Sequence, residues 1–90
     1  MPYANLIGGI LMNNRISLSQ LPVGKKANVY ALEADGSARR RLLDLGVIDG
    51  TEIESLYKSP SGNPVAYLIR GAVIALRKDV ADKITVLAQT

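Results

Sequence analysis

Five short segments of the chain are rich in apolar residues, and the second of them alternates apolar with polar side chains in the way that is typical of β-strands. They lie at residues 28–33, 51–57, 65–70, 72–76 and 84–87. Turn-forming residues separate them, namely Asp35-Gly36, Asp49-Gly50 and the cluster at 59–64. Short strands at this spacing predict a small, strongly bent antiparallel sheet or barrel, so we expect a mainly β fold.

The segment 51–57 contains one change of phase. Ile53 and Tyr57 share one phase of the alternation, whereas Leu56 falls in the phase of Glu52 and Glu54. A β-bulge would produce this change, and so would a strand that is covered on both faces. The pattern leaves both alternatives open.

One segment, residues 37–45, has the 3.6-residue period of a helix. Ser37 is its predicted N-cap, and Gly46 is its predicted left-handed stop. Leu43 falls outside the apolar stripe of this helix. Two shorter helical turns are predicted near 17–22 and 79–82. The stripe itself, which is expected to face the core, consists of Ala38, Leu42 and Leu45.

The start of the chain differs from the rest because it carries almost no charge. We interpret residues 1–16 as an apolar N-terminal extension and residues 17–90 as a single domain. Such an extension can lie over the domain or exchange with a neighbouring copy, which makes a homo-oligomer through residues 1–16 one expected outcome. Its apolar run is shorter than the about 20 residues that span a bilayer, and no basic residue precedes it. We therefore expect a cytoplasmic location, with neither membrane insertion nor a signal peptide.

The chain lacks three residue types that carry much of protein chemistry. Among its 90 residues there is no His, Cys or Trp, and the four Tyr are its only aromatic residues. This composition excludes thiolate and imidazole metal sites, disulfides, and Ser-His or Cys-His catalytic pairs. We therefore expect a protein that is not an enzyme and that has no cofactor.

The net charge of +3 permits contact with nucleic acid or with an acidic partner, but it requires neither. Barrels that bind nucleic acid usually need a positive groove with stacking aromatic residues. Here no strand face is rich in Lys, and the aromatic residues are only Tyr3, Tyr30, Tyr57 and Tyr67. A nucleic-acid partner is therefore not expected, and a small nucleic-acid-binding or self-associating barrel is the alternative function.

Three longer motifs occur along the chain in a fixed order. RRRLLDLGVIDGTEIE begins at Arg39, SPSGNPVAYLI begins at Ser59, and GAVIALRKDVADKITV begins at Gly71. Together these motifs resemble the FeoA family, the small ferrous iron transport protein A, and the resemblance covers residues 17–87. One departure is Asp49, where relatives often carry Pro. Asp keeps turn chemistry at this position without fixing the backbone angle.

The resemblance implies an SH3-like β-barrel that is similar to the C-terminal domain of iron-dependent repressors. It also implies a cytoplasmic accessory or regulatory protein of ferrous iron uptake. The implied partner is a FeoB-like membrane ferrous iron transporter, which has a cytoplasmic GTPase domain. The turn and motif residues that match the family pattern are Gly46, Gly50, Pro60, Gly62 and Pro64.

The run of Arg39, Arg40 and Arg41 is open to three interpretations. It can be a solvated helix face, a docking site for the transporter, or the source of an arginine finger that stabilises charge on a transferring phosphoryl group. Three adjacent side chains of a helix cannot all point the same way. Arg40 is the most outward of the three, because helical geometry places it opposite the apolar stripe.

Leu43 and Tyr67 are candidates for an exposed apolar docking patch, because an SH3-like barrel offers shallow grooves to a loop or peptide. The alternative is that both residues belong to the core. Tyr67 shares its phase with Val65 and Ile69, which favours the core for this residue. For Leu43 the pattern favours neither alternative.

Iron transport raises the question of a metal site. No imidazole or thiolate is present to select ferrous ions over other divalent cations. Although two of the carboxylates, Glu52 and Glu54, share a strand face, we expect solvated side chains there and no tight ferrous site. The available carboxylates are Glu33, Asp35, Asp44, Asp49, Glu52, Glu54, Asp79 and Asp82.

Overall fold

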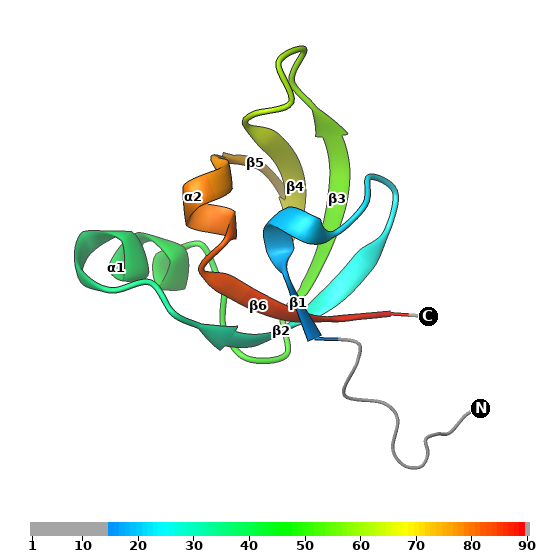
Figure 1. Cartoon of the computed structure of the whole chain (residues 1–90). Coiled ribbons are helices and arrows are strands. Elements are labelled where there is room, and N and C mark those ends of the chain that lie inside the picture. Colours follow the sequence, from blue (N-terminus) through cyan, green and yellow to red (C-terminus); the bar gives the residue numbers. More distant parts are fainter. Residues whose placement is uncertain (1–14, 90) are drawn as a thin grey trace.

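Six antiparallel strands form a single sheet in the computed structural model, which describes residues 15–89 (Figure 1). The strands are ordered β1-β6-β2-β3-β4-β5, and every neighbouring pair is antiparallel. The predicted mainly β fold is therefore confirmed. The elements in chain order are β1 (Arg15–Ser17), the 3₁₀ turn η2 (Leu18–Gln20), β2 (Lys26–Leu32), α1 (Gly36–Asp44), β3 (Glu52–Lys58), β4 (Val65–Ile69), β5 (Ala72–Leu76), α2 (Lys78–Ala81) and β6 (Ile84–Ala88).

Strand β1 is an addition to the five predicted strands. Its residues pair with β6, with Ile16 opposite Val86. Arg15 and Ile16, which the sequence pattern assigned to the N-terminal extension, thus belong to the sheet. A strand of three residues has too few positions to show an alternation, which is why the pattern does not reveal it. The predicted self-association concerns mainly residues 1–14, which lie outside the described residues.

The phase change predicted in residues 51–57 is a β-bulge. The register of β3 against β4 shifts between Ser55 and Tyr57. A second shift lies between Val29 and Ala31, where β2 pairs with β6. Bulges bend a strand and increase its twist. Both irregularities therefore help the sheet to curl around its core.

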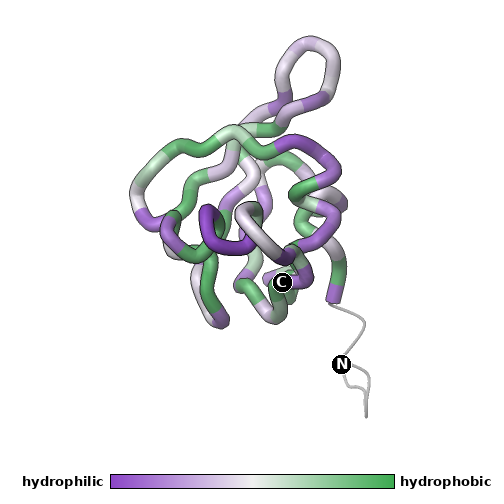
Figure 2. The backbone as a smooth tube through the Cα atoms, turned by 90° about the vertical axis from the view of Figure 1, so that its left-hand side faces the viewer, coloured by the Kyte–Doolittle hydropathy of each residue, from purple (hydrophilic) through white to green (hydrophobic). Residues whose placement is uncertain are grey.

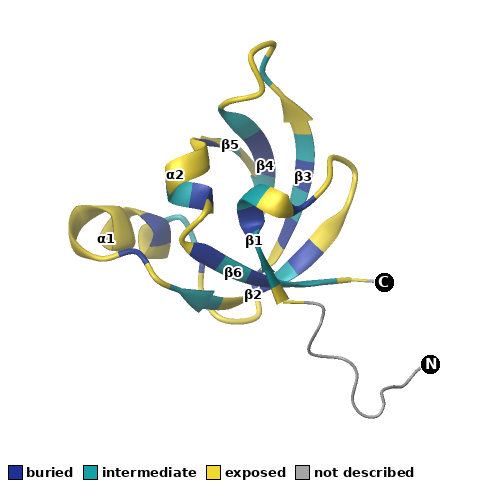
Figure 3. Cartoon of the chain, viewed as in Figure 1, coloured by how far each residue is buried: buried dark blue, intermediate teal, exposed yellow. Residues whose placement is uncertain are grey.

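The core fills the inside of the curled sheet (Figure 3). Outside it, polar residues gather in the 59–64 loop, which projects from the body of the molecule (Figure 2). Burial of the apolar side chains in this core is the main favourable term in folding. The largest fully buried side chains are those of Tyr67, Leu18, Leu42, Ile53, Ile69, Ile84, Val47 and Val86.

Helix α1 differs from its prediction at its first turns. The N-cap is Asp35 and not Ser37, because the helix already begins at Gly36. Ala38 is exposed, so its assignment to the core was wrong. The first half of α1 extends beyond the sheet, and only Leu42 is fully buried against it (Figure 3). No helix within residues 15–89 is long and apolar enough to cross a membrane.

The C-terminal end of α1 is held by a contact with the turn between β4 and β5. Gly46 ends the helix with a φ of +92°. A Cβ atom added at Gly46 would overlap Cδ of Arg70, so the stem of that arginine lies directly against the glycine backbone. Arg70 itself has a φ of +51°, and with Gly71 it forms a two-residue hairpin turn. The turn and the helix end are thus packed against each other.

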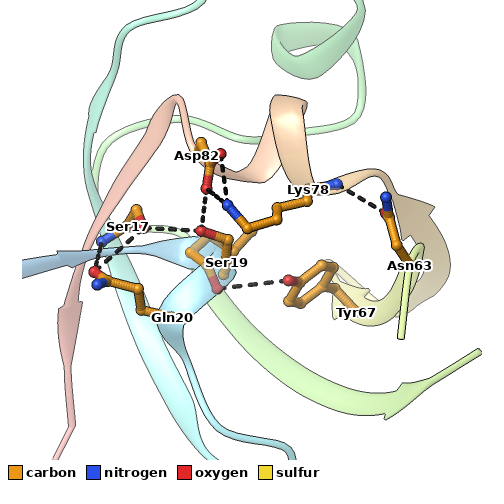
Figure 4. Close-up of polar contacts among 8 residues, drawn as sticks. Ser17, Ser19, Gln20, Asn63, Tyr67, Lys78 and Asp82 are labelled. Atoms are coloured by element: carbon orange, nitrogen blue, oxygen red, sulfur yellow. Dashed lines mark hydrogen bonds and ion pairs between the residues drawn. The ribbon is translucent and has the colours of Figure 1, made fainter. Parts of the chain in front are cut away.

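A polar cluster joins η2, α2 and the 59–64 loop (Figure 4). The Ser19 hydroxyl donates to Oδ1 of Asp82. Lys78 Nζ donates to both carboxylate oxygens of Asp82, at 3.1 and 3.3 Å. The backbone N–H of Lys78 donates to Oδ1 of Asn63 at 3.0 Å. The hydrogen bond from Ser19 and the contact with Lys78 lower the pKa of Asp82 below its usual value of 3.8.

The Gly46 contact predicts that Gly46→Ala lowers the free energy of unfolding more than Gly50→Ala does. The two glycines have nearly the same φ, +92° and +88°. Alanine at either position has to adopt the left-handed conformation, which lowers the free energy of unfolding by a similar amount, about 1–2 kcal/mol. Only at Gly46 does the new methyl group meet Arg70, whereas nothing lies within 4 Å at Gly50. Urea denaturation followed by circular dichroism measures both losses.

The double variant Gly46→Ala/Arg70→Ala is the control for this contact. Removing the Arg70 side chain removes the overlap, so the excess loss at Gly46 is expected to disappear. Equal losses for Gly46→Ala and Gly50→Ala would contradict the contact.

The polar cluster predicts a loss of stability in acid. The folded-state pKa of Asp82 is lowered, so its ionised carboxylate adds to the free energy of unfolding. This contribution is fully present above pH 3.8 and is lost as the pH falls through the folded-state pKa. Asp82→Asn should flatten the dependence of stability on pH in this range. Thermal unfolding at a series of acid pH values tests this. Asp79→Asn, on the same helix, is the matched control, and an equal effect of both variants would count against the cluster.

Candidate functional site

Arg39 and Arg40 lie on the outer side of α1, whereas Arg41 lies on the side toward β5. Arg39 Nη1 donates to the carbonyl oxygen of Leu32 at 2.9 Å, which ties the helix to the end of β2. Arg41 turns toward β5 and lines a groove there. Arg40 is exposed on the outer side of the helix. The run therefore does not act as one basic patch.

A shallow depression lies on the outer side of α1. Its volume is about 220 Å³. Leu43 is 41% exposed, so it lies on the surface and not in the core. An apolar side chain that charged groups surround in this way is a common feature of protein–protein contacts. The residues that line the depression, called here the α1 outer patch, are Gly36, Arg39, Arg40, Leu43 and Asp44.

A larger groove lies between α1 and the junction of β5 with α2. Its volume is about 630 Å³. Leu42 and Leu76 form a buried apolar floor. Arg41 and Arg77 are the charged residues of its lining, and both are positive. The residues that line this groove, called here the α1–β5 groove, are Ser37, Ala38, Arg41, Leu42, Ala75, Leu76, Arg77 and Val80.

Tyr67 is a core residue, and its interpretation as a docking residue was wrong. Only 1% of its surface is exposed. Its hydroxyl donates to the carbonyl oxygen of Leu18, at 3.5 Å. Burial raises the pKa of Tyr67 above its usual value of 10.0, and the nearby Asp82 carboxylate raises it further. The curled sheet turns this face of β4 inward, which explains why Tyr67 cannot reach a partner.

The turn residues shape the loops and do not line the α1 outer patch or the groove. Gly50 has a φ of +88°, and its N–H donates to the carbonyl oxygen of Val29 at 2.7 Å. Pro60, Gly62 and Pro64 lie in the loop between β3 and β4. There the N–H of Gly62 donates to Ser59 and the N–H of Ser59 donates to Pro64, which closes the loop.

The carboxylates do not gather into a metal site within residues 15–89, where no group of three potential ligands lies close enough to hold an ion. Glu52 accepts a hydrogen bond from Gln89 Nε2 at 3.0 Å. Glu52 and Glu54 line a depression of about 520 Å³ together with Arg70. The positive charge of Arg70 offsets part of the negative charge of these two carboxylates.

Sequence reasoning missed the groove residues of β5 and α2. Ala75, Arg77 and Val80 lie more than 30 positions from α1 in the sequence, and only the fold brings them together. A local pattern cannot report such a juxtaposition. The signal available in the sequence is an uncharged strand, Ala72–Leu76, that is followed directly by Arg77.

The family model for the FeoA domain matches residues 16–88. The chain therefore belongs to the FeoA domain family. A fusion protein of Porphyromonas gingivalis, the Fe(2+) transport protein A/Fe(2+) transporter FeoB fusion protein, is 35% identical over 69 residues. The match includes 77% of this chain but only 8% of the fusion protein. This chain thus corresponds to a small part of that relative.

Solved structures of FeoA proteins have the same fold. The solution structure of FeoA from Chlorobium tepidum has a TM-score of 0.79 and 33% identity, covering 83% of this chain and 71% of that chain. FeoA from Stenotrophomonas maltophilia, a prokaryotic SH3 domain protein whose crystal structure contains zinc, has a TM-score of 0.72 and 31% identity, covering 79% and 88%. The fold is therefore SH3-like.

A manganese-dependent transcriptional repressor shares the fold as well. Its TM-score is 0.74 at 18% identity, covering 83% of this chain and 42% of the repressor. At this identity the likeness concerns the fold alone.

The buried phenol predicts a loss of stability at high pH. The folded-state pKa of Tyr67 is raised, so its neutral phenol adds to the free energy of unfolding. This contribution is present below pH 10.0 and is lost as the pH rises through the folded-state pKa. Tyr67→Phe should reduce this alkaline loss, as measured by urea denaturation between about pH 8 and 11. Tyr57→Phe is the control, because Tyr57 is 59% exposed. The same alkaline loss in the wild type and in Tyr67→Phe would contradict the assignment.

Proposed function

We propose that this protein is a non-enzymatic accessory protein of ferrous iron uptake, which binds the cytoplasmic side of a FeoB-like membrane transporter. The fusion of a related FeoA sequence with a FeoB transporter in one chain is the observation that supports this most. A fusion keeps its two parts at a high effective concentration. A relative that makes this connection covalently supports a non-covalent association of the two parts here.

The α1 outer patch is the surface that we assign to this contact. Leu43 offers an exposed apolar side chain, and Arg40 offers a charged side chain beside it. Arginine is among the residues that contribute most to protein–protein affinity, and the buried centre of an interface is apolar. The helix projects from the sheet, so a flat cytoplasmic domain can reach the patch without meeting the strands (Figure 1).

The mechanism in this proposal is surface recognition. The composition offers no tuned pair of acid and base near neutral pH, so the protein acts on the GTPase domain or on transporter assembly through contact. A cytoplasmic location is part of the same proposal, because the GTPase domain lies there. The proposal also includes a homo-oligomer through residues 1–16, which would present several copies of the α1 outer patch.

The proposal predicts that Leu43→Asp weakens binding to the transporter at least tenfold and leaves the melting temperature unchanged. Leu43→Asp removes the apolar side chain and adds a carboxylate that loses water in the contact, whereas at an exposed position the change costs the free protein little. Isothermal titration against the soluble GTPase domain and against the full transporter in nanodiscs measures the first effect. Thermal unfolding measures the second.

Val23→Asp is the matched control. Val23 is 46% exposed, close to the 41% of Leu43, but it lies in the loop before β2. The control should bind as the wild type does. If both variants bind equally well, the α1 outer patch is not the contact. If Leu43→Asp lowers the melting temperature, Leu43 supports the core instead.

A further inference from the structure

Strand β5 is an open edge of the sheet. It is the last strand in the sheet order and, among the described residues, it pairs with β4 alone. Its five residues include no charged residue and no proline, which are the features that usually protect an edge strand. Val73 is 58% exposed. This edge can therefore accept a further strand.

The register defines which backbone groups are free at this edge. Arg70 and Gly71 form a two-residue turn, so Ile69 and Ala72 are the hydrogen-bonded pair that closes the hairpin. Hydrogen-bonded and non-hydrogen-bonded pairs alternate along an antiparallel ladder. The N–H and C=O groups that point away from β4 therefore belong to Val73 and Ala75.

The α1–β5 groove lies at the C-terminal end of this same edge. It is lined by three consecutive residues, Ala75, Leu76 and Arg77. Neighbouring side chains of a strand point to opposite faces, so a groove that touches both Ala75 and Leu76 lies at the edge of the strand and not on one face. Leu42 of the groove floor and Val80 of α2 are apolar residues of its lining. A strand added to β5 would therefore place alternate side chains against an apolar surface.

The charges of the groove determine which strand fits it. Arg41 and Arg77 are both positive, and no carboxylate is part of the lining. A strand with carboxylates between its apolar residues would complement them. A second copy of β5 would not, because antiparallel pairing of two copies brings the Arg77-Lys78 exit of each close to the Arg70-Gly71 turn of the other. Like charges that face each other across strands are destabilising.

We propose that an extended segment of the partner, with apolar residues alternating with Asp or Glu, binds β5 as an added antiparallel or parallel strand along the α1–β5 groove. The backbone of Val73 and Ala75 makes the hydrogen bonds, Leu42 and Val80 receive apolar side chains, and Arg41 and Arg77 pair with carboxylates. This mode of recognition is β-strand addition. The inference rests on the proposed function, because the partner that supplies the segment is the transporter.

The test uses three synthetic heptapeptides and the full chain labelled with ¹⁵N. The first peptide alternates valine with glutamate, and the second replaces each glutamate with lysine. The third has the sequence of the first but carries N-methyl groups on the amides of one edge, so it keeps its charges and side chains but cannot complete the ladder. All three are capped at both ends and titrated to about 5 mM, where even weak binding registers.

The expected result is that the valine–glutamate peptide shifts the amide signals of Val73 and Ala75 together with those of Arg41 and Arg77. The lysine peptide and the N-methylated peptide should bind at least tenfold more weakly. Val73→Pro removes one free N–H of the edge, which strands tolerate at that kind of position, and should also weaken binding tenfold. Val73→Thr, which keeps the N–H and the side-chain shape, is the matched control.

Several results would overturn the inference. These are a valine–glutamate peptide that shifts no signal of β5, an N-methylated peptide that binds equally well, and shifts of β5 signals that depend on protein concentration without any peptide. Should Val73→Pro fail to fold, the N-methylated peptide tests the same hydrogen bonds on the wild-type protein.

The outcome is separable from that of the proposed function. Binding of the transporter together with no binding of the valine–glutamate peptide overturns the strand inference alone. Binding of the peptide at β5 together with no binding of the transporter overturns the proposed function and with it the identity of the partner.

Discussion

The contact between Gly46 and Arg70 fixes the position of α1, and both candidate surfaces depend on that position. Apart from Leu42, the helix buries little against the sheet, so its apolar face alone would hold it weakly. The left-handed turn at Gly46 brings the chain back toward the core at Val47 and lets the stem of Arg70 lie against the glycine backbone. Because Arg70 belongs to the β4–β5 turn, the same contact joins the C-terminal end of α1 to that turn.

This arrangement separates two kinds of surface on one short helix. The outer side presents Leu43 and Arg40 to solvent, and the inner side turns Arg41 toward β5. Arg39 has a structural task, because it donates to backbone carbonyl groups at the end of β2. A protein of 90 residues thus has two surfaces that combine apolar side chains with arginine.

Local patterns predicted the strands well, because short apolar segments between turn residues are typical of strands, and alternation reports on the pleat where a strand is half-buried. The bulge near Tyr57 was visible for the same reason, as a break in the alternation. The N-cap of α1 was misplaced, since Asp35 and Ser37 are both good capping residues and only the backbone decides between them. For Tyr67 the phase indicated a face of β4 but not whether that face was enclosed. The uncharged segment Ala72–Leu76 with Arg77 after it was the only trace of the α1–β5 groove in the sequence, and it could not identify β5 as an edge, because that depends on the order of strands in the sheet.

Binding of the wild-type chain to a FeoB-like transporter tests the central claim most directly. The measurement is a titration of the purified protein, with and without residues 1–14, against the soluble cytoplasmic GTPase domain and separately against the full transporter in nanodiscs. The account predicts saturable binding to at least one of the two. An absence of binding to both at concentrations up to about 1 mM, where a binding free energy of about 4 kcal/mol would still register, would contradict it.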